Sequence, residues 1–78
     1  MTTAQEMKLN GVKAYFKVTD YYDDYVIDRT QTLQEAREIA KQYYKDCDGK
    51  CSLVISKHVY NEAVGKYIKQ QTEYKIWR

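Results

Sequence analysis

The segment TLQEAREIAKQYYK, residues 32–45, decides the fold, because it carries the strongest helix signal in the chain. Thr32 and Glu35 have the spacing of a capping box, in which the threonine hydroxyl accepts a hydrogen bond from the glutamate backbone N–H and the glutamate side chain reaches back. Apolar side chains recur behind this start at helical spacing and form one stripe: Leu33, Ala36, Ile39, Ala40 and Tyr43. Gly49 is suited to end the helix. The pattern predicts a helix with one face to bury.

Strand patterns lie on both sides of this helix. Residues 12–19 alternate strictly between apolar and polar, and residues 25–29 predict a strand that returns as a hairpin. Residues 51–60 and 66–77 predict two more strands, joined by a loop that contains Gly65. The order β-β-α-β-β predicts an α+β, two-layer domain, with an antiparallel sheet of about four strands and the amphipathic helix packed on one face.

The 78 residues fit one domain. Residues 1–10 show no period and are expected to be a flexible N-terminal arm, so the domain covers residues 11–78. Neither a signal peptide nor a stretch that could span a bilayer is recognised, which favours a cytoplasmic location. In that compartment Cys47 and Cys51 are expected to be reduced thiols, and a disulfide would require an oxidising compartment.

Nine tyrosines are the most unusual feature of the composition, beside one phenylalanine and one tryptophan. A domain this small cannot bury nine phenol rings and satisfy every hydroxyl. Tyrosine combines an apolar ring with a polar tip and is enriched where a partner covers a surface. The composition therefore indicates a contact module, while the net charge of +2 is too small to identify the partner.

One candidate site is the sheet face that a single helix cannot cover. Aromatic and basic residues are expected to project from it: Lys13, Tyr15, Lys17, Tyr67, Lys69, Lys75 and Trp77. Proteins that bind single-stranded nucleic acids stack bases on such rings and neutralise phosphates with such lysines. A basic stripe on the outer helix face could also grip phosphates: Arg37, Lys41 and Lys45. Such residues are also common on solvated sheets and helix faces, which is the more frequent case, and the open sheet face could pair with itself in a homodimer.

A second candidate site is the loop that links the first two strands. It mixes carboxylates with phenols over Asp20, Tyr21, Tyr22, Asp23, Asp24 and Tyr25. Such a surface can imitate a nucleic-acid backbone or dock on an arginine-rich protein. A polar hairpin connection kept soluble by its acids explains the same residues.

No cofactor, metal site or catalytic motif is predicted. Cys47, Cys51 and His58 could ligate zinc, but the chain holds no fourth cysteine or histidine. His58 is expected to be a surface residue on a strand. Because no nucleophile is paired with a base and a short chain leaves little room for a pocket, we do not expect an enzyme.

The helix residues Thr32, Leu33, Glu35, Ala36, Ile39 and Ala40, followed by the hairpin from Leu53 to Trp77, resemble small phage and mobile-element proteins. Among these are type I-F anti-CRISPR inhibitors of bacterial defence. The resemblance concerns shape. It implies a non-enzymatic protein that inhibits a host protein or ribonucleoprotein complex by stoichiometric surface binding. A nucleic-acid-binding domain and a structural homodimer remain alternatives.

Overall fold

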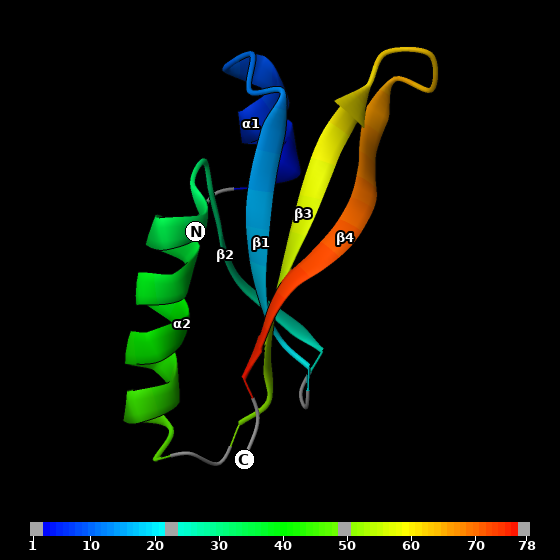
Figure 1. The fold of residues 1–78 in the computed structure, drawn as a ribbon. Helices are drawn as coiled ribbons and strands as arrows, with labels where there is room; N and C mark the ends of the chain where they lie inside the picture. Colours follow the sequence, from blue (N-terminus) through cyan, green and yellow to red (C-terminus); the bar gives the residue numbers. More distant parts are fainter. Residues whose placement is uncertain (1–2, 22–23, 49–50, 77–78) are drawn as a thin grey trace.

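The computed structural model describes residues 3–21, 24–48 and 51–76, the last six by their backbone alone, and it has two layers (Figure 1). The elements in chain order are α1 (Ala4–Leu9), β1 (Ala14–Asp20), β2 (Tyr25–Thr30), α2 (Leu33–Asp46), β3 (Leu53–Asn61) and β4 (Lys66–Ile76). The predicted class is confirmed in its coarse form, an α+β fold with a four-stranded antiparallel sheet. The second helix, α1, was not predicted.

The four strands form one sheet in the order β2-β1-β3-β4, and every neighbouring pair is antiparallel. β1 lies inside the sheet and pairs with β2 on one side and β3 on the other. In Figure 1, α2 runs along the sheet, whereas α1 sits at the end where β1 begins and the β3–β4 hairpin turns. The two helices therefore cover different parts of the sheet.

The main core lies between α2 and the sheet. Val18, Leu53 and Ile55 come from the strands and are at most 1% exposed, and Ala36 and Ala40 on α2 are fully buried against them. Two alanines let the helix backbone approach the sheet closely. Each fully buried valine, leucine or isoleucine contributes about 1.5–3 kcal/mol, so this cluster is a major source of the stability of the domain. The predicted apolar stripe of the helix is confirmed.

α2 begins with the predicted threonine cap in a modified form. The hydroxyl of Thr32 accepts a hydrogen bond from the backbone N–H of Glu35 at 3.2 Å and donates to the Glu35 carboxylate at 2.8 Å. At the other end the left-handed residue is Asp48, with φ of +58°, and its N–H donates to the carbonyl of Lys45. Gly49, predicted to end the helix, lies outside the described residues.

The prediction of a flexible arm differs from the structure over the described residues 3–10. Thr3 caps the helix α1 by accepting a hydrogen bond from the N–H of Glu6 at 3.2 Å, and Met7 is only 4% exposed. The carbonyl of Met7 also accepts from the N–H of Val12 at 3.0 Å, which ties the helix to the entry of β1. A six-residue helix makes fewer than two turns, too few for a visible period in the sequence.

Cys47 and Cys51 form a disulfide, so the expectation of two reduced thiols is wrong for this structure. The chain turns at Asp48 directly after α2, which brings the two Cα atoms to 6.3 Å, within the usual range for a disulfide. The bond joins the end of α2 to the start of β3. No helix in the described part of the chain is long and apolar enough to cross a membrane.

Candidate functional site

The sheet face opposite α2 carries cations from three strands. Strand pairing places Arg29 of β2 opposite Lys17 of β1, and Lys69 of β4 opposite His58 of β3. Tyr15 in turn lies opposite His58, one alternate position from Lys17. Since neighbouring strands are about 4.8 Å apart, the three cations span roughly 14 Å across the sheet. They form what we call the cationic face: Lys17, Arg29 and Lys69.

Tyr15 lies beneath this face and is only 3% exposed. Its ring stacks on His58, with centroids 5.1 Å apart and planes 9° from parallel, and meets the edge of Tyr67 at 4.7 Å. The Arg29 guanidinium lies 5.7 Å from the centre of the Tyr15 ring, as a cation–π contact. Tyr15 is thus a packed residue, and the prediction that it stacks bases is wrong because the rings of His58 and Tyr67 already pack against it.

His58 is also buried, at 8% exposed, which corrects its predicted place on the surface. Its Nε2 atom lies 2.9 Å from the Oγ atom of Ser56, which is 4% exposed. Burial lowers the pKa of His58 to about 4, and the positive charges of Lys17, Arg29 and Lys69 act in the same direction. The imidazole is therefore neutral at pH 7, and either ring tautomer can satisfy the serine hydroxyl.

The cations of this face also disfavour one another. Burial lowers the pKa of Lys17, and Arg29 and Lys69 lower it further, while Asp24 has a weaker opposite effect. Several positive charges on one face create a positive potential that attracts polyanions. The arrangement can therefore hold a polyanion by charge, with the aromatic cluster as its support.

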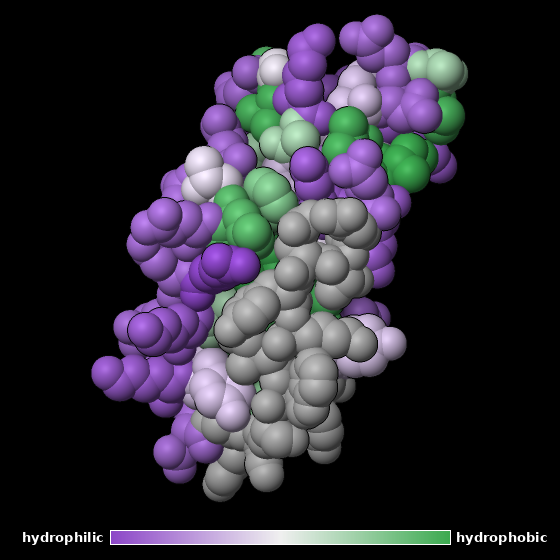
Figure 2. Space-filling model, viewed as in Figure 1, coloured by the Kyte–Doolittle hydropathy of each residue, from purple (hydrophilic) through white to green (hydrophobic). Residues whose placement is uncertain are grey.

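The other residues predicted for nucleic-acid binding are dispersed. Lys13 and Lys69 are exposed, and Tyr67 is half-buried with its hydroxyl donating to the carbonyl of Val12. The side chain of Lys75 and all of Trp77 lie outside the described residues. The basic residues of α2 are exposed on the outer side of the helix, away from the sheet, where Figure 2 shows hydrophilic side chains: Arg37, Lys41 and Lys45.

Arg29 was missed from the sequence. Arg29 lies in the predicted strand 25–29, so the sequence shows that its side chain is on one of the two sheet faces. A hairpin register that pairs Lys17 with Arg29 puts both side chains on the same face. An irregularity between Val18 and Thr19 shifts the register by one residue and so brings Arg29 opposite Lys17. The sequence alone left it open.

In the predicted contact loop, some residues are buried and others are exposed. Asp20 is only 2% exposed and accepts a hydrogen bond from the hydroxyl of Tyr43 on α2 at 3.2 Å, so its assignment to a partner surface is wrong. It lies at the last position of β1, on the helix side of the sheet. Tyr21 and Tyr25 are 73% and 52% exposed, and Asp24 is exposed with φ of +52°. Residues 22–23 lie outside the described part of the chain.

Within residues 3–21, 24–48 and 51–76, no three histidine, cysteine or acidic side chains gather as metal ligands. The cysteines proposed as an alternative zinc pair are instead the disulfide. No protein-family model matches the chain, and neither a curated protein nor a solved structure is significantly similar to it. The resemblance to anti-CRISPR inhibitors therefore stays a prediction.

Proposed function

We propose that the protein is a non-enzymatic binding module that holds the phosphate backbone of a nucleic acid on its cationic face. One observation carries the proposal: three strands deliver cations to one face, with Lys17 opposite Arg29, and with Lys69 across β3 and level with Tyr15. Phosphate contacts of this kind supply most of the sequence-independent affinity of nucleic-acid-binding proteins. In this form of binding the phosphates contact the cations, and the buried ring of Tyr15 does not stack on bases.

The buried pair Ser56 and His58 supports the non-enzymatic part of the proposal. A serine hydroxyl beside an imidazole resembles a nucleophile with its base. Ser56 and His58 are only 4% and 8% exposed, however, so a substrate could not reach the serine oxygen without opening the sheet. The pair satisfies its own buried polar atoms, which accounts for its geometry without chemistry.

The proposal is tested by measuring the affinity of labelled single- and double-stranded oligonucleotides by fluorescence anisotropy between about 50 and 200 mM salt. Three phosphate contacts on a single strand should give a log–log salt slope of about −2, since each contributes about −0.7. Lys17→Gln or Lys69→Gln should each reduce the slope by about one contact. Lys41→Gln removes one charge from the outer side of α2 and serves as the matched control. Failure to bind at the lowest salt, or an equal loss with Lys41→Gln, would refute the proposal.

A second candidate is a stoichiometric inhibitor that contacts a host protein complex through the β1–β2 hairpin. Tyr21 and Tyr25 favour it, because both rings are more than half exposed at the same end of the hairpin. Changing both to serine should abolish capture of a protein partner while leaving the melting temperature unchanged within a few degrees. A homodimer is the third alternative, and sedimentation at micromolar concentration separates it from both.

A further inference from the structure

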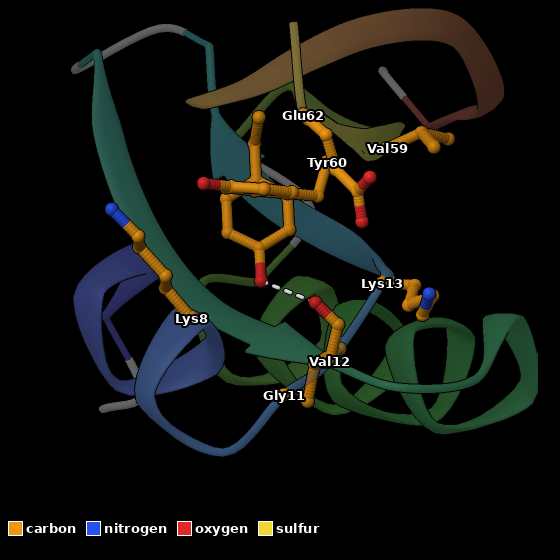
Figure 3. Close-up of a pocket in the computed structure, with 8 residues that line it drawn as sticks. Lys8, Gly11, Val12, Lys13, Val59, Tyr60 and Glu62 are labelled. Carbon is orange, nitrogen blue, oxygen red and sulfur yellow. Dashed lines mark hydrogen bonds between the residues drawn. The ribbon is translucent and has the colours of Figure 1, made fainter. Parts of the chain in front are cut away.

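A hollow of about 400 Å³ opens at the end of the sheet where α1, the loop before β1 and the β3–β4 hairpin meet (Figure 3). Tyr60 and Tyr67 provide aromatic walls, and Val12 and Val59 provide aliphatic ones. An adjoining hollow shares both tyrosines and adds Leu9, which is 79% exposed. Figure 2 shows hydrophobic side chains interspersed with hydrophilic ones at this end of the molecule. The volume lies within the range of small-molecule sites, which are mostly apolar with few polar groups.

The walls of this pocket are held in place by contacts within the protein. The hydroxyl of Tyr67 donates to the carbonyl of Val12, and its ring meets the ring of Tyr60 edge to face at 5.1 Å. Val12 is in turn bound to Met7 of α1 by a backbone hydrogen bond of 3.0 Å. A ligand would therefore enter a site that is already formed, which lowers the entropic cost of binding.

The charged groups of the pocket favour an anion. Lys8 and Lys13 lie on opposite sides of it in Figure 3, and the Nζ atom of Lys8 is 5.9 Å from the centre of the Tyr60 ring. Glu62 is the one acid among the lining residues, so these three side chains carry a net charge of +1. A ligand of one negative charge would balance them, with its apolar part against the tyrosines.

We propose that this pocket binds a small organic monoanion, a carboxylate with a flat apolar body, between Lys8 and Lys13. The carboxylate lies toward the ammonium groups and the apolar body lies along Tyr60 and Tyr67. None of Lys17, Arg29 and Lys69 lines this pocket, although Lys69 lines a neighbouring hollow that shares Lys13 and Tyr60 with it. The proposal of an anion site in this pocket therefore does not depend on whether the protein binds nucleic acid.

The test uses naphthoate, naphthylmethanol and naphthylmethylamine, which share a ring system and differ in charge. Each is titrated into the full chain and followed by two-dimensional amide NMR spectra. Naphthoate should shift the amides of residues 8–13 and 59–62 and bind about tenfold more tightly than the alcohol, the effect of one charge-assisted hydrogen bond. The amine should bind more weakly than the alcohol.

Lys13→Gln should remove most of the preference for naphthoate over the alcohol, because it removes one of the two ammonium groups beside the carboxylate. Lys13 is exposed, so the change should leave the fold intact. Lys8→Gln provides a second variant on the opposite wall, and Lys41→Gln is the control with the same change of charge far from the pocket. The proposal is overturned if naphthoate causes no shifts, if the alcohol or amine binds equally well, or if the shifts map to another part of the chain.

Discussion

The low pKa of His58 predicts a specific loss of stability in acid. The unfolded chain has the ordinary histidine pKa of 6.5, and the folded chain has a value of about 4. Between these values the unfolded chain binds more protons, so the free energy of unfolding falls as the pH drops from 6.5 to 4. Above pH 6.5 the contribution of His58 is fully present.

The size of the effect follows from the two pKa values. At 1.36 kcal/mol for each pH unit, the full difference corresponds to roughly 3 kcal/mol. Lys69 is exposed, so water and salt screen its part of the effect, and we expect about 2 kcal/mol. At roughly 0.1 kcal/mol per residue, a chain of 78 residues has about 8 kcal/mol in total. The loss is therefore a substantial part of the stability.

Urea denaturation of the wild type and of His58→Gln at several pH values between 4 and 7 measures this effect. Carboxylates also titrate in acid, but they do so in both proteins, so the difference between the two curves isolates His58. The wild type should lose about 2 kcal/mol more than the variant over this range. Parallel curves would refute the account of a buried neutral imidazole beneath three cations. NMR titration of the imidazole protons gives an independent value, because His58 is the only histidine in the chain.

Three further predictions concern the scaffold. Replacing Cys47 and Cys51 by serine should lower the free energy of unfolding by about 2 kcal/mol, the loop entropy of a short cross-link, and an unchanged denaturation midpoint would contradict a disulfide in the folded protein. Thr32→Ala should cost about 1 kcal/mol by removing the cap of α2, with Thr32→Ser as the variant that keeps the cap. Met7→Ala should cost about 2 kcal/mol or more in thermal and urea unfolding if α1 is packed, whereas a flexible arm would make the change neutral.

The main layers of the fold could be predicted from the sequence because their signals are local. The helix cap at Thr32 and the stripe from Leu33 to Tyr43 are set by neighbouring residues, and the alternation through Val18 identifies which side of β1 is buried against α2. Both patterns could be recognised because a helix and a strand have fixed periods, so residue spacing in the sequence corresponds to a face of the element.

The candidate site could be predicted only in part, because alternation shows which face a side chain occupies and not what covers that face. Tyr15 was placed correctly on the face opposite Val18, but its burial depends on the rings of His58 and Tyr67, which come from distant strands. Asp20 was read as part of an exposed loop, yet β1 continues through it and Tyr43 reaches it from α2. Both errors concern contacts between residues distant in the chain.

The central claim, that phosphates bind on the cationic face, is tested most directly by the pKa of His58. It can be measured by NMR in the presence and absence of oligothymidylate, whose bases do not take up protons in acid. Phosphates between Lys17, Arg29 and Lys69 would offset the charges that lower the pKa of the imidazole. We predict that saturating oligothymidylate raises this pKa above about 4, and that high salt reverses the change as it releases the ligand. A pKa that stays the same when the oligonucleotide is bound would contradict the account.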